Sequence, residues 1–213
     1  MLETNDAARA AILGHIRTAN SSVDGAMCSV EYKAIERTYQ QSASMGRVAI
    51  LKKFAERLHE YDAQVYEATS ATLRATIDEV FAGHDQKSAI VANGFRQECL
   101  PEALNWQAEA DADIAAMNRT EGAIVTCEVA IAHTGTIVLK DARRLTLLPD
   151  RLLCVVREDQ VVETVPEAIA HLQPFASEAL TFISGPSATA DIEMTRIRGV
   201  HGPRFLDVIL VKD

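Results

Sequence analysis

Short, almost continuous apolar runs limit what this chain can fold into. Ile137-Val138-Leu139 and Val208-Ile209-Leu210-Val211 have no polar residue on either face of a pleated strand. Because successive strand side chains point to opposite faces, such runs suit strands that are buried on both sides. They alternate with segments of helical periodicity. The pattern therefore predicts a layered α/β fold, in which helices cover a sheet.

Helical and strand patterns alternate from about residue 46 onward. A helix is expected over 46–60, with an apolar face formed by Val48, Leu51, Phe54, Ala55 and Leu58. A second helix is expected over 70–82, with Gly83 at the C′ position, and a third over 166–172. Residues 101–118 are expected to form a helix and a surface connection. Strands are expected at 63–68, 88–91, 123–126, 136–139, 152–157, 180–183 and 206–211.

The N-terminal part of the chain has a different pattern. Ala8, Ile12 and Ile16 are spaced four apart, which predicts a helix, whereas residues 20–45 are polar and show no clear period. We therefore expect a helical extension over 1–45, followed by an α/β domain over 46–213.

Composition excludes several classes of function. The 213 residues carry a formal net charge of −9, which argues against binding to nucleic acid or to anionic membranes. No run approaches the ~18 apolar residues of a membrane span, and the N-terminus lacks the basic start of a secretory signal, so a cytoplasmic location is expected. The cysteines, Cys28, Cys99, Cys127 and Cys154, lie far apart. That spacing favours reduced, mostly buried thiols over disulfides, zinc or an iron–sulfur cluster in this chain.

Two turns beside predicted strands gather hydroxyl groups and glycine. Thr134-Gly135-Thr136 (the TGT turn) precedes one strand, and Ser184-Gly185-Pro186-Ser187 (the GPS turn) follows another. Backbone amides in such turns can bind an anion. The alternative is a pair of tight turns in which glycine only provides the conformation.

We expect the TGT and GPS turns to lie close together, although about 50 residues separate them. Ligands of open α/β sheets bind at the carboxyl ends of strands, and both turns adjoin predicted strands.

Charged residues follow the GPS turn. Asp191 and Glu193 are two apart, so they share a face on extended backbone and diverge on a helix. Paired carboxylates can bind a metal or perform acid–base chemistry. Acids after a Ser/Thr turn also cap helices or hold loops in place, and this alternative stays open.

A cationic loop comes next. Arg196, Arg198 and Arg204 surround His201 and Gly202, with no acid between Met194 and Phe205. A guanidinium matches carboxylate and phosphate oxygens, so this pattern predicts a pocket for a small anion. The alternative is that these arginines pair with acids, Arg204 with Asp191, Glu193 or Asp207. His201 and His133 are histidines in polar turns, where either an acid–base or a structural role is possible.

Two blocks of sequence resemble the lactate-utilisation (LUD) domain family. They are CEVAIAHTGTIVL and SGPSATADIEMTRIRGVHGPRFLDVILV. The resemblance is strong over 120–213, weaker over 46–120 and faint before residue 46. It implies a Rossmann-like α/β/α sandwich with a mixed sheet, related to sugar-phosphate isomerases and CoA-transferases. It also implies a part in oxidising L-lactate to pyruvate, within a three-protein system whose other subunits carry iron–sulfur clusters.

One position departs from the family pattern. The family's AETGT motif reads Ala132-His133-Thr134-Gly135-Thr136 here, so His133 replaces the usual glutamate. If that glutamate acts like the catalytic carboxylate of the CoA-transferases, thioester chemistry cannot occur at this position.

The sequence therefore favours an accessory subunit of a lactate-oxidising system, without a cofactor of its own, that binds a small carboxylate or phosphate. The alternatives are an independent enzyme acting on a phosphorylated or CoA-linked small molecule, and a structural scaffold. The expected ligand-binding residues are Thr134, Gly135, Thr136, Ser184, Gly185, Ser187, Asp191, Glu193, His201, Gly202 and Arg204.

Overall fold

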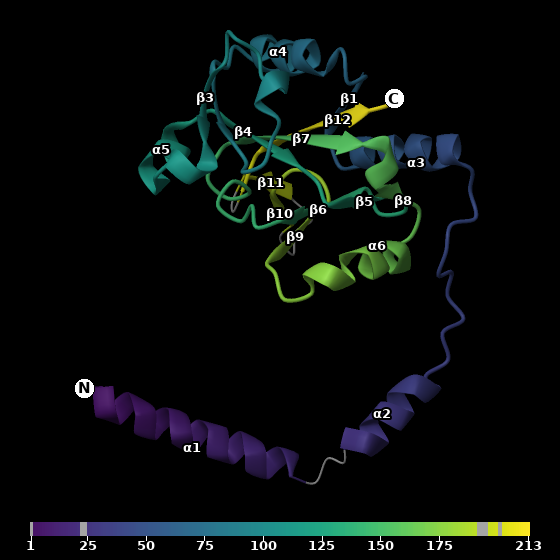
Figure 1. Ribbon diagram of the computed structural model, residues 1–213, viewed down its shortest axis with the longest axis vertical. Coiled ribbons are helices and arrows are strands. Elements are labelled where there is room, and N and C mark those ends of the chain that lie inside the picture. Colours follow the sequence, from purple (N-terminus) through teal and green to yellow (C-terminus); the bar gives the residue numbers. More distant parts are fainter. Residues whose placement is uncertain (1, 22–24, 191–195, 200–201) are drawn as a thin grey trace. The chain divides into compact units, whose positions relative to one another are not determined.

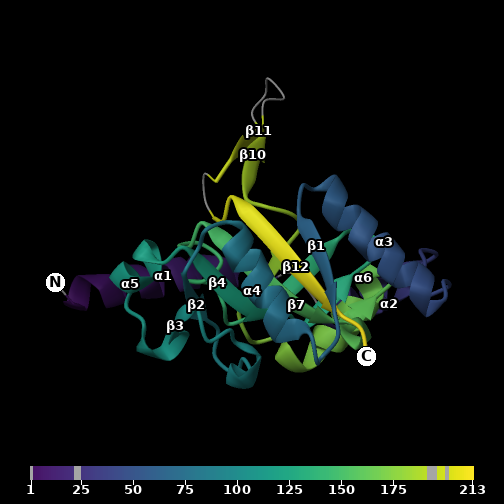
Figure 2. The same cartoon turned by 90° about the horizontal axis from the view of Figure 1, so that it is seen from above.

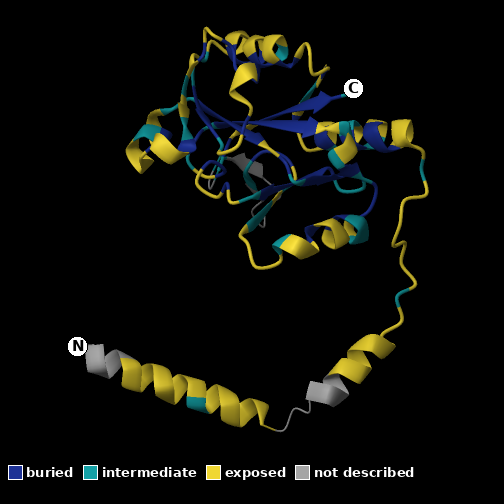
Figure 3. Ribbon diagram, viewed as in Figure 1, coloured by how far each residue is buried: buried dark blue, intermediate teal, exposed yellow. Residues whose placement is uncertain are grey.

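The computed structural model describes residues 2–21, 25–190, 196–199 and 202–213. The chain divides into two units, Met1–Tyr39 and Gln40–Asp213. The first contains α1 (Leu2–Asn20) and α2 (Gly25–Ala34). The expected helix is present in α1, but Ile12 and Ile16 are 60% and 50% exposed, and most of both helices is exposed (Figure 3). The apolar spacing thus predicted the helix without a buried face. No helix in the described ranges is long and apolar enough to cross a membrane.

A six-stranded sheet forms the centre of the second unit (Figures 1 and 2). Its order is β1-β12-β7-β4-β2-β3, and every neighbouring pair is parallel. The strands are β1 (Gln64–Ala68), β2 (Ser88–Val91), β3 (Asn105–Ala108), β4 (Gly122–Thr126), β7 (Arg151–Arg157) and β12 (Phe205–Val211). β12 is buried from Leu206 to Val211. Every residue in that range is apolar except the acid Asp207, which is also buried.

A second, four-stranded sheet holds the other apolar run. Its order is β8-β5-β6-β9, in which β5 and β8 are parallel and the other pairs antiparallel. The strands are β5 (Val129–Ile131), β6 (Thr136–Lys140), β8 (Val161–Val162) and β9 (Leu180–Ile183). The α/β class is therefore confirmed, but the strands divide between a parallel and a mixed sheet. A hairpin of β10 (Ala188–Ala190) and β11 (Arg196–Arg198) stands out from both (Figure 2).

Helices cover both sheets and complete three cores. The α-helices of this unit are α3 (Arg47–Glu60), α4 (Leu73–Gly83), α5 (Ile114–Arg119) and α6 (Val165–Leu172). Short 3₁₀ turns occupy Gln97–Cys99, Glu109–Asp111, Glu158–Gln160 and Gln173–Phe175. α4 packs on one face of the parallel sheet. α3 and the second sheet pack on its other face, and α6 covers the outer face of the second sheet (Figure 1). The described cysteines with placed side chains, Cys99, Cys127 and Cys154, are free and buried in these cores.

Two local expectations were wrong. Val48 is 82% exposed, and Ile50 is buried instead, because the buried stripe of α3 centres on Phe54 and Leu58. Residues 101–118 contain the edge strand β3 as well as α5. The strand was missed because Asn105–Ala108 is short and alternates polar and apolar residues. It pairs only with β2.

The end of α4 also differs from expectation. Gly83 belongs to the helix, and Asp85, with φ of 53°, is the left-handed residue. The N–H of Asp85 bonds to the carbonyl of Ala82, and that of Gln86 to the carbonyl of Phe81. This bonding is a Schellman motif with aspartate in the usual glycine position.

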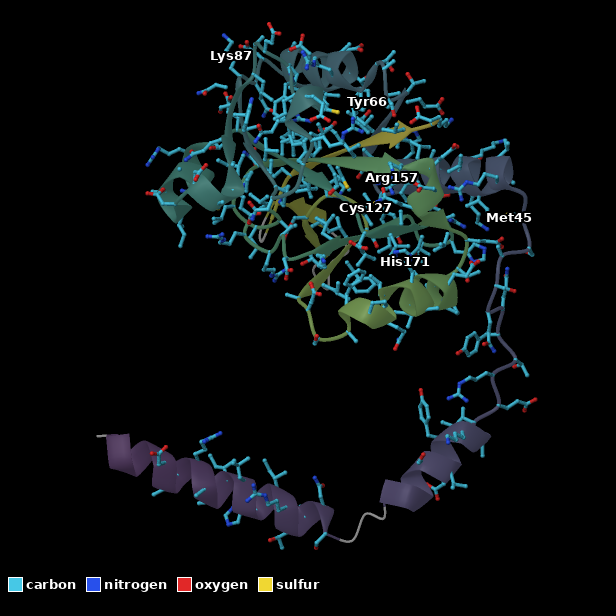
Figure 4. All side chains as sticks on the ribbon, viewed as in Figure 1. Met45, Tyr66, Lys87, Cys127, Arg157 and His171 are labelled. Carbon is cyan, nitrogen blue, oxygen red and sulfur yellow. The ribbon has the colours of Figure 1, made fainter. Side chains whose placement is uncertain are left out.

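A buried carboxylate fixes the start of the second unit. Glu163, which follows β8, is 1% exposed. Its oxygens accept hydrogen bonds from the Gln40 amide (2.8 Å), the Ser44 N–H (2.7 Å) and the Met45 N–H (2.8 Å). Figure 4 shows Met45 where the segment over residues 40–45 reaches α3. The pKa of Glu163 is lowered to about 2, chiefly by the Met45 N–H and then by Gln40 and Ser44, against the effect of burial.

A buried ion pair joins β7 to β12. Arg151 is 3% exposed and Asp207 is fully buried; their side chains are hydrogen-bonded. Burial raises the pKa of Asp207, although Arg151 opposes that rise. Among the described residues, Arg151 Nε and Asp207 Oδ1 have no hydrogen-bond partner. The pair is thus only partly satisfied, and its desolvation cost is not fully offset.

The Glu163 carboxylate should make stability depend on pH. The carboxyl titrates near pH ~4.3 when the chain is unfolded and near 2 when folded. Its contribution is therefore complete above the unfolded pKa and lost as the pH falls toward 2. Glu163→Gln should lower the melting temperature most at pH 6 and progressively less down to pH 2.5. Glu102→Gln, at a side chain 94% exposed, is the control. Equal pH profiles for Glu163→Gln and wild type would contradict this prediction.

Removing one partner of the buried ion pair should cost more than removing both. Arg151→Met leaves a buried, uncompensated carboxylate and should lower the free energy of unfolding by about 3–5 kcal/mol. The double variant Arg151→Met, Asp207→Leu should recover most of that loss. Urea unfolding measures both values. If the double variant lost as much free energy of unfolding as Arg151→Met and Asp207→Leu lose together, the two groups would not interact.

Candidate functional site

The TGT and GPS turns meet, as expected. Thr136 Oγ1 lies 2.8 Å from Ser184 Oγ, and Ile137 pairs with Ile183. The reason differs from the one expected. The turns lie at adjacent ends of the antiparallel strands β6 and β9, whereas we expected them at the carboxyl ends of strands in an open α/β sheet.

The hydroxyl groups of the two turns form a short hydrogen-bonded row. Thr134 Oγ1 lies 2.6 Å from Thr136 Oγ1, which in turn contacts Ser184. Thr136 is 6% exposed, whereas Ser184 is exposed. The row thus joins the half-buried Thr134 to the exposed Ser184 through the buried Thr136.

The glycines of both turns lie against α3. Gly135 and Gly185 have φ of 59° and 82°, a region that side chains rarely adopt. A Cβ on Gly135 would lie 2.8 Å from Arg57 Cβ, and one on Gly185 would lie 2.6 Å from Tyr61 Cβ. Arg57 and Tyr61 are four apart, at the C-terminal end of α3. The glycines therefore provide both the turn conformation and the close approach of this helix.

A pocket of about 340 Å³ opens beside the GPS turn. Of the expected site residues, Ser184, Gly185, Ser187 and Gly202 line it. Thr134, Gly135, Thr136 and Arg204 are not among its lining residues. Its apolar wall includes Leu152 and Leu206, near the amino-terminal ends of β7 and β12.

Part of the pocket lining comes from a segment that sequence reasoning missed. Arg143, Thr146 and Leu147 line the pocket from the connection between β6 and β7. The Thr146 N–H bonds to the carbonyl of Ala142, and the Leu147 N–H to that of Arg144, so the segment coils like a helix. Positions i, i+3 and i+4 share a helical face. That spacing was the available signal, but nothing in sequence placed the segment beside the GPS turn.

Arg204 is held by an acid that was not expected. Its Nε and Nη2 lie 2.6 Å from the two carboxylate oxygens of Asp150. This bonding raises the pKa of Arg204. Asp207, one of the expected partners, pairs with Arg151 instead. A ligand at Arg204 would therefore have to compete with Asp150.

Backbone hydrogen bonds tie the GPS turn to the loop before β12. The Ser187 N–H donates to the carbonyl of Pro203 (2.8 Å), and the Gly199 N–H donates to the carbonyl of Ser187 (2.9 Å). Ser187 and Gly202 are thereby brought together at the pocket. Asp191, Glu193 and His201 lie outside the described residues.

His133 contacts Glu163, which follows β8, and is not among the described lining residues of the pocket. Its Nε2 lies 3.3 Å from Glu163 Oε1, and its N–H bonds to the Glu163 carbonyl. The same carboxylate binds the segment over residues 40–45, so His133 shares in that attachment. In the described parts of the chain, no group of three or more His, Cys, Asp or Glu could hold a metal ion.

Comparisons with known proteins agree with this architecture. The LUD domain model matches residues 2–211. The chain is 36% identical to "Lactate utilization protein C" of Deinococcus radiodurans, over 81% of this chain and 84% of that one. It is 30% identical to the protein of the same name from Anoxybacillus flavithermus, over 77% and 80% of the two chains. A crystal structure of a DUF162 family protein from D. radiodurans superimposes with a TM-score of 0.69 and 31% identity, covering 79% of this chain and 100% of that one. The family model spans almost the whole sequence and the relative from D. radiodurans most of it, so this chain belongs to the LUD domain family.

Proposed function

We propose that this chain is an accessory subunit of an iron–sulfur system that oxidises L-lactate in the cytoplasm, and that it binds a small anionic ligand. The relatives named lactate utilization protein C support a role in lactate utilisation. The pocket beside the GPS turn is the observation that carries the binding role.

The residues that line the pocket suit binding better than catalysis. Its described lining contains one charged group, Arg143, together with the hydroxyls of Thr146, Thr181, Ser184 and Ser187. A proton-transfer catalyst at neutral pH is most often histidine or a carboxylate, and none is among those lining residues. The described lining therefore supports recognition of a ligand.

Oxidising lactate to pyruvate removes two electrons and two protons, which an acceptor must take up. The cysteines of this chain are dispersed in sequence, whereas iron–sulfur clusters need grouped thiolates. We therefore propose that partner subunits hold the clusters and pass on the electrons, and that this chain completes the assembly.

Reconstitution tests the accessory role. The chain is purified with its native iron–sulfur partners, and L-lactate oxidation is followed with an artificial electron acceptor. Oxidation should need this chain in addition to the partners, and the chain alone should be inactive. Full activity without the chain would contradict the proposal. Turnover of a phosphorylated or CoA-linked compound by the chain alone would favour an independent enzyme.

Elemental analysis tests the assignment of the clusters. The chain, expressed and purified without partners, should contain neither iron nor zinc in stoichiometric amount, because its cysteines lack the grouped spacing of such sites. One equivalent or more of either metal would place a metal centre in this chain and overturn the division of roles.

A further inference from the structure

We infer that Arg143 holds the carboxylate of a monocarboxylic acid in the pocket beside the GPS turn. The inference rests on the anion-binding part of the proposed function, for which it names the anchoring residue and the class of ligand. It does not depend on the link to lactate oxidation.

Two neighbouring arginines of the coiled segment 142–148 contact different parts of the structure. Ala142 and Leu145 are buried in the core between the sheets, which fixes how the segment turns. Arg143 then lines the pocket. Arg144 is directed elsewhere, and its Nη2 lies 3.8 Å from Glu109, an acid that is 4% exposed.

The lack of a described ion-pair partner distinguishes Arg143 from the other cations nearby. Arg144 is near Glu109, and Arg204 is bonded to Asp150 through both carboxylate oxygens. Arg143 has no side-chain hydrogen bond or ion pair with any other described residue, and no acid is among the described residues that line the pocket. In a chain with net charge −9, an arginine that lines a pocket and has no described charge partner is suited to an anion, since a guanidinium can bond to both carboxylate oxygens at once.

The same count of charges favours a carboxylate over a phosphate. One guanidinium compensates one negative charge, whereas a phosphate ester carries roughly −1.5 to −2 at neutral pH. The other polar groups of the lining, such as the Ser187 and Thr181 hydroxyls, are neutral. A second negative charge would therefore lack a described cationic partner in the pocket.

The wall beyond the polar groups is apolar. Leu152 and Leu206, which are 1% and 2% exposed, line the pocket together with Pro186 and Pro203. A volume of about 340 Å³ is at the lower end for small-molecule sites, which span roughly 300–1,000 Å³. A three-carbon acid would fill only part of it. An acid with a longer apolar chain would bury that chain against the leucines and bind more tightly.

Calorimetric titration of the full chain tests this assignment, with pyruvate, 2-oxohexanoate and inorganic phosphate as probes. We expect 2-oxohexanoate to bind more tightly than pyruvate, and both more tightly than phosphate. Arg143→Ala should weaken carboxylate binding by about tenfold or more, and Arg143→Lys by less. The matched control Arg144→Ala should leave the dissociation constants within about twofold. Because Arg143 is exposed, its variants should melt like wild type.

Each outcome has a separate meaning. Carboxylate binding that survives Arg143→Ala in a folded protein would overturn the assignment and leave an anion site elsewhere. Tighter binding of phosphate than of either acid would overturn the ligand class. No binding of any probe to wild type would contradict the anion-binding part of the proposed function itself. Reconstituted lactate oxidation tests the accessory role independently of all three.

Discussion

Packing of α3 against both sheets is the interaction on which the rest of the second unit depends. Phe54 and Leu58, both fully buried, pack in the same core as strands of the parallel sheet and of the mixed sheet. The C-terminal end of α3 then reaches the TGT and GPS turns, where only glycine leaves room for it. One helix therefore packs in the core that joins the two sheets and lies against both the TGT and the GPS turn.

The two turns have separate roles as a result. Gly135 is buried beneath α3, so the TGT turn contributes mainly to packing and to the hydroxyl row. The GPS turn lies on the same row, but Ser184 and Ser187 face the pocket. The family motif and the candidate binding site are thus neighbours that share one hydrogen bond, between Thr136 and Ser184.

Sequence predicted the local elements well because they depend on local patterns. The apolar runs at 137–139 and 208–211 are buried strands, and the repeated spacing over 46–60 is a helix. Their grouping into two sheets depends on pairings such as Ile137 with Ile183, which no local pattern contains. Charge partners are non-local in the same way. The bonding of Arg204 to Asp150, and the presence of Arg143 beside the GPS turn in one pocket lining, follow only from the assembled fold. The cluster of cations around Arg204 was visible in sequence. Arg143, the cation that lines the pocket, lies outside that cluster.

The position of β12 has a consequence for how this protein folds. Although β12 is the last strand in the chain, it lies between β1 and β7. Until it is inserted, β1 has no neighbour in the sheet, and the edge of β7 that it covers is open. Until β12 pairs, the parallel sheet therefore has a gap between its edge strand β1 and β7, with unpaired strand edges of the kind that favour aggregation. Closing the gap joins residues about 140 positions apart, such as Gln64 and Asp207, and such distant contacts slow folding.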